Sequence, residues 1–209
     1  VNSDNALPPA FAQRATELGL RQVATLSFPT MARAPDDRGG ASRLVALKSV
    51  ADGYPLRGRL QVADGPEGPA RPAGGIPAPG EAWVDAALLE ALDLRIGDPL
   101  LLGNHRLRLG RVIAVEPDRG GGFMNFAPRV MIHEADLPAT GLVQPASRLT
   151  WRLAVAGEDR AVRAYVAWAE AQVKRPDVRG VRVESLDSGR PEMRQTLDRA
   201  STFLRLVAL

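Results

Sequence analysis

The sequence predicts an α+β protein with a small, mostly β unit in the middle of the chain. Two runs with strand-like alternation, 108–116 and 130–132, enclose a glycine triplet, and a clean alternation at 149–155 precedes a helical apolar stripe at 158–174. Strands and helices distributed in this way are typical of an α+β fold. With 209 residues, the chain is long enough for two small domains, and we expect two.

The composition is ordinary for a globular protein and narrows the function classes. Hydrophobic residues make up 45% and charged residues 24% of the chain, and no run approaches the roughly 20 apolar residues that cross a bilayer. The net charge is only +3, and the arginines are spread along the chain without a basic cluster, which argues against nucleic acid as a partner. The absence of cysteine excludes disulfides, thiolate catalysis and cysteine metal sites.

The first 55 residues predict a helix followed by a β-hairpin. Pro8 and Pro9 open the helix and Gly19 ends it, because proline favours the first helical turn and glycine the position after the last. The expected elements are a helix at 7–18, a strand at 20–31 interrupted at Phe28 and Pro29, a turn at 33–40 and a strand at 43–50.

The middle of the chain predicts a linker and then a folded unit. Residues 64–80 are so rich in glycine and proline that neither helix nor strand is expected to propagate through them, so we expect a long, mobile surface loop. Asp85 is the expected N-cap of a helix at 86–92, and a strand at 100–102 follows. The strand at 108–116 alternates with one slip near Gly110.

The last third of the chain predicts strand, helix, strand and helix. After the strand at 149–155 and the helix at 158–174, three valines between 178 and 183 indicate a further strand. Residues 191–209 then place apolar side chains at helical spacing with no stop signal. We therefore expect this helix to run on in a longer, membrane-attached protein.

The glycine triplet between the two central runs predicts a displayed loop. A turn begins at 117–118, and residues 120–122 give the backbone a freedom that places Phe123, Met124 and Phe126 at the tip or flank. Two interpretations stay open. The apolar side chains contact a partner or lipid, or the phenylalanines fold back and fill a small core.

No catalytic constellation is evident in the sequence. Its histidines, His105 and His133, lack the H-x-x-H or H-E-x-x-H spacing of metal sites. There is no G-x-S-x-G nucleophile elbow, and the glycine triplet lacks the Lys-Ser/Thr of a phosphate-binding loop. We therefore expect no catalytic residue, no metal and no cofactor.

Four stretches of the sequence carry a resemblance to a known family. They are 45–60 (VALKSVADGYPLRGRL), 75–98 (GIPAPGEAWVDAALLEALDLRIGD), 116–157 (EPDRGGGFMNFAPRVMIHEADLPATGLVQPASRLTWRLAVAG) and 197–209 (LDRASTFLRLVAL). They resemble the periplasmic core domain of MacB/FtsX-type (type VII) ABC transporter permeases, and most of all the YbbP-like permeases. Residues 118–145 are the most specific part of the match.

The resemblance covers nearly the whole chain and implies its fold and location. In this family, the periplasmic domain lies between the first and second transmembrane helices of a bacterial inner-membrane protein. On this chain, it implies a discontinuous, porter-like αβ subdomain near the membrane at 1–55 and 147–209. An inserted, mostly β (Sabre-like) subdomain at 56–146 would split it.

The resemblance also implies a noncatalytic domain that works in a larger assembly. ATP hydrolysis is expected in a separate cytoplasmic ABC ATPase subunit, and a second permease copy is expected beside the first. The domain then transmits motion from the membrane helices (mechanotransmission) to a periplasmic partner such as an SGNH-type esterase or lysophospholipase, or it binds and extracts a lipid or lipoprotein. A stand-alone hydrolase is the alternative from another class, and the missing nucleophile constellation argues against it.

Two groups of candidate site residues follow from the loop and the last helix. The residues expected to contact a partner or substrate are Arg119, Phe123, Met124, Asn125 and Phe126. The residues expected on a coupling helix that carries motion between membrane and domain are Met193, Leu197 and Leu204.

Overall fold

The computed structural model describes residues 1–119, 126–144 and 147–185. Its helices are α1 (Pro9–Glu17), α2 (Ala86–Leu92), α3 (Leu137–Thr140) and α4 (Asp159–Val173), with 3-10 turns η1 (Asp36–Arg38) and η3 (Glu134–Asp136). Its strands are β1 (Asn2–Ser3), β2 (Arg21–Arg33), β3 (Ser42–Val50), β4 (Gln61–Ala63), β5 (Arg71–Pro72), β6 (Glu81–Val84), β7 (Pro99–Leu102), β8 (His105–Val115), β9 (Arg129–His133), β10 (Thr150–Ala156) and β11 (Val181–Arg182). The fold is a mixture of helices and strands, as expected for the α+β class.

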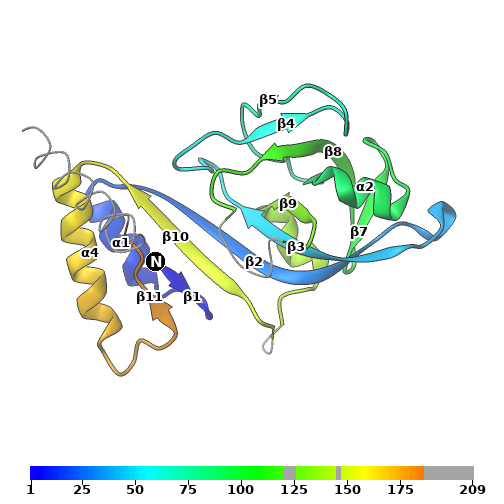
Figure 1. Ribbon diagram of the computed structural model, residues 1–209. Helices are drawn as coiled ribbons and strands as arrows, with labels where there is room; N and C mark the ends of the chain where they lie inside the picture. The colour runs from blue at the N-terminus through cyan, green and yellow to red at the C-terminus, as the bar shows by residue number, and fades with distance from the viewer. Residues whose placement is uncertain (120–125, 145–146, 186–209) are drawn as a thin grey trace, which may run out of the picture.

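Six of the strands close into a small barrel. The described strands lie in the order β11-β1-β10-β2-β3-β9-β6-β8-β4-β5, and β7 pairs with both β2 and β8 (Figure 1). The ring therefore runs β2-β3-β9-β6-β8-β7 and back to β2. Its pairs are antiparallel except for β3 with β9 and β6 with β8. In a closed barrel, the backbone N–H and C=O groups that would be unpaired at the edges of an open sheet gain hydrogen-bond partners.

Apolar side chains fill the barrel, and α2 covers it. The alternation of each strand sends one set of side chains inward, and these pack with three leucines of α2. The fully buried members include Ala32, Val45, Leu47, Ala82, Val84, Leu88, Leu100, Leu102, Leu107, Leu109, Val130 and Ile132. Burial of this many side chains makes the barrel a major source of folding free energy.

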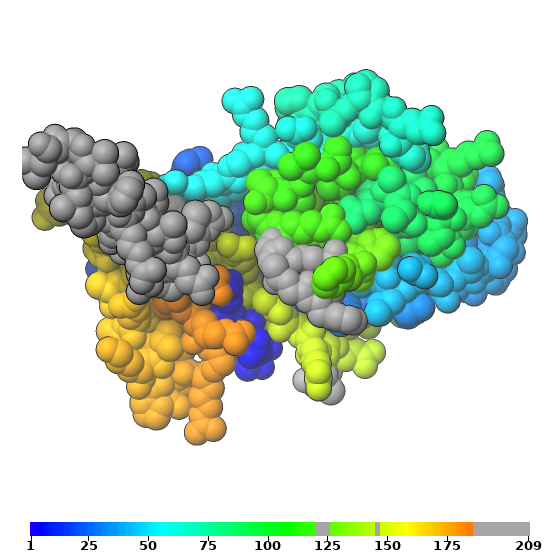
Figure 2. Space-filling view, viewed as in Figure 1, coloured from blue at the N-terminus to red at the C-terminus, as the bar shows by residue number. Residues whose placement is uncertain are grey.

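A separate helical layer lies at the other end of the molecule. There α1 and α4 pack against β10 and the start of β2, and the barrel lies at the far end from α4 (Figures 1 and 2). Phe11 of α1 stacks edge-on against Trp168 with ring centroids 5.2 Å apart, and Tyr165 donates a hydrogen bond to the Phe11 carbonyl at 3.2 Å. Because β2 pairs with β10 and with β3, this one strand runs through both parts.

The N-terminal prediction is confirmed except at one point. The helix and the hairpin form where expected, but β2 continues through Phe28 and Pro29 to Arg33, so the predicted interruption is wrong. The reason is the position of Pro29. The pairing of β2 with β10 ends at Ser27 and its pairing with β7 starts at Ala32, so Pro29 lies where, among the described residues, one side of β2 has no neighbouring strand. Proline is tolerated at such edge positions.

The middle of the chain differs from the prediction in two details. Helix α2 has the predicted bounds with Asp85 at its N-cap, but the Asp85 side chain makes no capping hydrogen bond. The glycine- and proline-rich segment 64–80 contains the short strand β5, which pairs with β4, although no strand was expected there. The slip near Gly110 is confirmed, because the pairing of β6 with β8 skips this residue.

The C-terminal elements agree with the sequence as far as the structure describes them. β10 and α4 lie within one residue of the predicted bounds, and β11 is a short strand inside the predicted 178–183 run. The predicted helix at 191–209 lies outside the described residues. The boundaries at 55/56 and 146/147 remain predictions, and β2 and β3, which precede residue 55, belong to the barrel.

Candidate partner-contact site

Phe126 is the most exposed large apolar side chain in the described part of the chain, with 86% of its surface accessible. It lies three residues before β9, at the end of the glycine-rich segment. For this residue, the interpretation as a core plug is wrong. The other predicted loop residues, Phe123, Met124 and Asn125, lie outside the described residues, so their expected role is untested.

One carboxylate holds the two ends of this segment together. Arg119 donates from its two terminal nitrogens to the two oxygens of Asp85, at 3.1 and 2.5 Å. The backbone N–H of Arg129 donates to the same carboxylate at 2.9 Å, and the Asp85 N–H donates to the Arg129 carbonyl at 3.0 Å. The hydrogen bonds with Asp85 raise the pKa of the Arg119 guanidinium. Asp85 is therefore used to anchor the segment rather than to cap α2.

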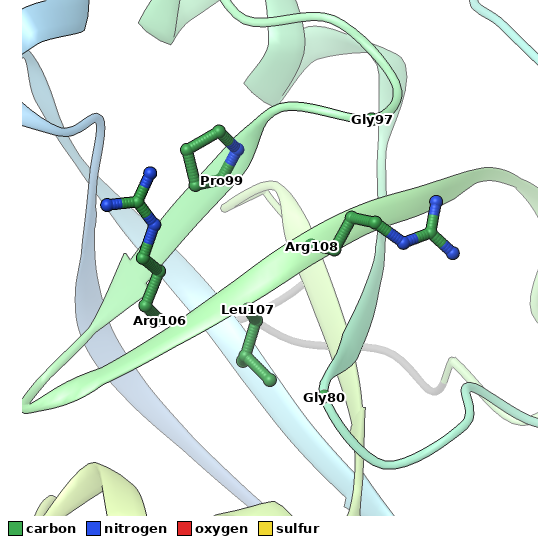
Figure 3. A pocket seen from close by; sticks show the side chains of 6 residues that line it. All are labelled: Gly80, Gly97, Pro99, Arg106, Leu107 and Arg108. Atoms are coloured by element: carbon green, nitrogen blue, oxygen red, sulfur yellow. The ribbon is translucent and has the colours of Figure 1, made fainter.

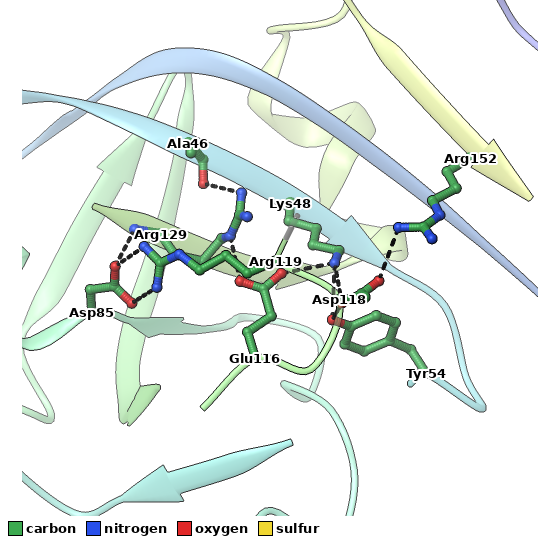
Figure 4. Close-up of polar contacts among 9 residues, drawn as sticks. All are labelled: Ala46, Lys48, Tyr54, Asp85, Glu116, Asp118, Arg119, Arg129 and Arg152. Atoms are coloured by element: carbon green, nitrogen blue, oxygen red, sulfur yellow. Dashed lines mark hydrogen bonds and ion pairs between the residues drawn. The ribbon is translucent and has the colours of Figure 1, made fainter. Parts of the chain in front are cut away.

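A buried ionic cluster lies behind this anchor (Figure 4). Glu116 is fully buried between two cations: Lys48 Nζ donates to Glu116 Oε1 at 2.8 Å, and Arg129 Nε donates to Glu116 Oε2 at 2.7 Å. Lys48 also donates to Asp118 at 2.8 Å and to the Tyr54 hydroxyl at 2.9 Å. All three N–H groups of the Lys48 ammonium thus have an acceptor. This cluster joins β3, the end of β8 and β9.

The cluster keeps Asp118 ionised. Burial alone would raise the pKa of Asp118, but the charge and hydrogen bond of Lys48, the hydrogen bond of Tyr54 and the charge of Arg152 outweigh burial and lower it. For Tyr54, burial and the neighbouring Asp118 carboxylate both raise the pKa of the phenol. The Tyr54 hydroxyl therefore stays protonated and donates to Asp118 in a short hydrogen bond.

Sequence analysis did not find this cluster, although one signal was present. Lys48 is one of two lysines in the chain and lies in the strand 43–50, whose other residues from Val45 to Val50 are almost all apolar. A lysine in such a strand indicates either an outward face or a buried partner. The partners, Glu116 and Arg129, belong to other segments, and the sequence does not place them beside it.

The two histidines do not meet. His105 Nε2 lies 3.3 Å from Asp136 Oδ1, whereas His133 Nδ1 accepts the Ala135 N–H at 3.0 Å. Across residues 1–119, 126–144 and 147–185, no group of three His, Asp or Glu side chains is arranged to hold a metal ion. Both histidines therefore have local structural partners.

A shallow, open hollow is present on another face of the barrel (Figure 3). Its lining residues are Gly80, Gly97, Pro99, Arg106, Leu107 and Arg108. Arg108 is paired with Glu81 at 3.0 Å, and the hollow contains neither Phe126 nor the ionic cluster.

None of the helices in the described part of the chain has the length and apolar character needed to cross a membrane. The predicted coupling residues Met193, Leu197 and Leu204 lie outside that part.

The chain has a sequence relative among known proteins. No protein-family model matches the chain. Over all 209 residues, it is 33% identical to the uncharacterized ABC transporter permease YbbP of Escherichia coli (strain K12). The chain spans 24% of the length of that protein.

The similar solved structures include two domains of lower sequence identity. The extracellular domain of the noncanonic ABC-type transporter YknZ from Gram-positive bacteria has 14% identity and a TM-score of 0.49, over 77% of this chain and 81% of that one. The periplasmic region of MacB from Actinobacillus actinomycetemcomitans has 11% identity and a TM-score of 0.48, over 90% and 82%. Both TM-scores lie below 0.5.

The sequence relative confirms the resemblance to the YbbP-like permeases that the sequence predicts. Its alignment includes the loop ends Arg119 and Phe126 and the whole of the ionic cluster, because it covers every residue of the chain. Along its entire length, the chain is 33% identical to a part of the E. coli permease YbbP that makes up about a quarter of that protein.

Proposed function

We propose that this chain is the periplasmic domain of an ABC transporter permease and passes motion from the membrane helices to a bound partner. The partner would bind at the segment between Arg119 and Arg129 that carries Phe126, called the Phe126 segment below. The observation that carries the proposal is the 86% exposure of Phe126 beside an anchored pair of strand ends. An exposed aromatic side chain on a fixed base is a typical anchor of a protein contact, since it offers a large apolar area.

Anchoring at Asp85 supports this role physically. A flexible segment loses conformational entropy when it binds, whereas a segment with fixed ends loses less. Arg119 and Arg129 reach the same carboxylate from the two sides of the segment. A shift of the barrel would therefore displace Phe126 with it, which is what transmission of motion requires.

The proposed assembly has several parts beyond this chain. A cytoplasmic ABC ATPase subunit would supply the energy, and two permease copies would complete the transporter in the bacterial inner membrane. The porter-like subdomain at 1–55 and 147–209 would connect to the membrane helices, with Met193, Leu197 and Leu204 on the coupling helix. The inserted, mostly β subdomain at 56–146 would present Phe126. The domain itself would be noncatalytic.

The proposed partner is a periplasmic protein, such as an SGNH-type esterase or lysophospholipase. A second candidate function is the binding and extraction of a lipid or lipoprotein, which the exposed Phe126, Met31 and Leu44 side chains favour because they offer apolar surface. Purification of the full-length permease from membranes, followed by identification of the bound molecules, separates the two. A bound soluble hydrolase supports the first, bound lipid or lipoprotein the second, and neither in stoichiometric amount contradicts both.

A further inference from the structure

Asp118 connects the buried ionic cluster to β10. Its Oδ1 atom accepts from Lys48 at 2.8 Å, and its Oδ2 atom lies 3.7 Å from Arg152 NH1 (Figure 4). The two contacts differ in character. Lys48 has a side-chain exposure of 5%, whereas Arg152 has 42%, so the first contact is fixed in the interior and the second is open to water.

The strand that carries Arg152 lies between the two parts: Trp151 packs against the barrel core, and the residues that follow Arg152 pack in the helical layer. β10 pairs with β1 and with the first half of β2, and Leu153 beside Arg152 packs with the residues of α1 and α4. Asp118, in contrast, follows β8 in the barrel and precedes Arg119, which Asp85 holds. The Arg152–Asp118 pair therefore joins the helical layer to the base of the Phe126 segment.

The geometry suits a contact that is made and broken. At 3.7 Å, the pair is longer than a hydrogen bond, and both side chains reach solvent, so separating the pair leaves no buried charge without a partner. The contacts of Glu116 with Lys48 and Arg129 are shorter and fully buried, so they hold the rest of the cluster in place. Of these contacts, only the one between Arg152 and Asp118 can separate without leaving a buried charge unpaired.

We propose that the Arg152–Asp118 contact is the adjustable link through which a displacement of β10 reaches the Phe126 segment. The proposal rests on the proposed function, because it names the residues that transmit the motion. Arg152 acts as a positioning residue: it changes where Asp118, and with it Arg119, lies relative to the helical layer. It does not itself contact the partner.

The test uses the full-length permease with its ATPase in lipid nanodiscs. A nitroxide is attached at Ala127→Cys, next to Phe126, and the change in its spectrum is measured on addition of ATP and vanadate. We expect the native permease to show a nucleotide-dependent change, Arg152→Gln to lose it, and Arg152→Lys to retain it. Asp118→Asn should lose it too, and the double variant should show no further loss.

The matched control is Arg182→Gln. Arg182 pairs with Asp4 at 3.3 Å on β11, two strands from Arg152 in the same sheet, and its substitution should leave the nucleotide-dependent change intact. If Arg152→Gln keeps the full change, the proposed link is wrong while the proposed function stands. If the native permease shows no change at all, transmission to this segment fails, and the link fails with it. An unaltered nucleotide-free spectrum for Arg152→Gln excludes simple unfolding.

Discussion

Lys48 Nζ lies 2.8 Å from Glu116 Oε1, and both side chains are almost completely buried, although 68 residues separate them in the sequence. This ion pair fixes β3 against the end of β8. With Arg129 on the other carboxylate oxygen, it forms the interior support of the Phe126 segment.

Neutralising the central carboxylate should strongly destabilise the fold. In Glu116→Gln, Arg129 would remain buried without its counter-charge and Lys48 would keep only Asp118, so we expect a loss of about 3–5 kcal/mol in the free energy of unfolding. Urea denaturation of the native and variant chains measures this difference. The control is Asp36→Asn, which breaks the exposed pair with Arg33 and should cost no more than about 1 kcal/mol. Equal urea midpoints for Glu116→Gln and the native chain would contradict the assigned role.

Stability should fall in acid partly because of Asp118. The folded-state pKa of Asp118 lies below its ordinary value of 3.8, so the ionised form stabilises the fold above that value. As the pH falls through the folded-state pKa, the carboxylate takes up a proton and this contribution is lost. We therefore expect the unfolding free energy of the native chain to decrease more steeply below about pH 4 than that of Asp118→Asn. Parallel pH curves for the two chains would show that Asp118 contributes nothing.

The closed barrel predicts a sharp contrast between neighbouring residues of β8. Leu109 is fully buried in the barrel core, whereas Arg108 points outward and pairs with Glu81. Leu109→Ala should cost about 2–5 kcal/mol of unfolding free energy because it leaves a cavity. Arg108→Ala should cost about 1 kcal/mol or less, since it removes an exposed ion pair. Similar losses in thermal or urea unfolding for both variants would show that β8 does not line a closed core.

Transmission should depend on a rigid last helix. Insertion of two glycines near Thr196 should weaken the predicted helix at 191–209 by about 1 kcal/mol for each glycine while leaving the barrel folded. The complete transporter carrying this insertion should lose physiological activity. A control insertion of two alanines preserves helix propensity but shifts the register, so it separates stiffness from alignment. Full activity of the glycine variant would exclude rigid coupling.

Local patterns predicted most of the elements, because strand alternation and helical spacing are properties of neighbouring residues. The hairpin, α2, α4 and β10 all follow from such patterns. Closure of the barrel did not, since it depends on the pairing of β7 with β2, a segment far away in the sequence. The continuous course of β2 through Pro29 was missed for the same reason: whether a proline interrupts a strand depends on which neighbour it faces.

The candidate site could be predicted in part. The glycine triplet indicated a displayed segment, and the exposure of Phe126 agrees with it. Its anchor could not be predicted, because Asp85 was expected to cap a helix and instead binds Arg119 and Arg129. An aspartate before a helix satisfies either role equally well at the level of sequence. Only the three-dimensional arrangement decides between them.

Phe126→Ala tests the central claim most directly. The variant is compared with Val143→Ala, which truncates another exposed apolar side chain, in two measurements: unfolding of this chain, and the amount of the natural partner that copurifies with the full-length permease. We predict unchanged unfolding for both variants, and for Phe126→Ala alone a loss of binding of about 1 kcal/mol or more, roughly fivefold in affinity. Undiminished partner binding by Phe126→Ala, or a loss of several kcal/mol in its stability, would contradict the account.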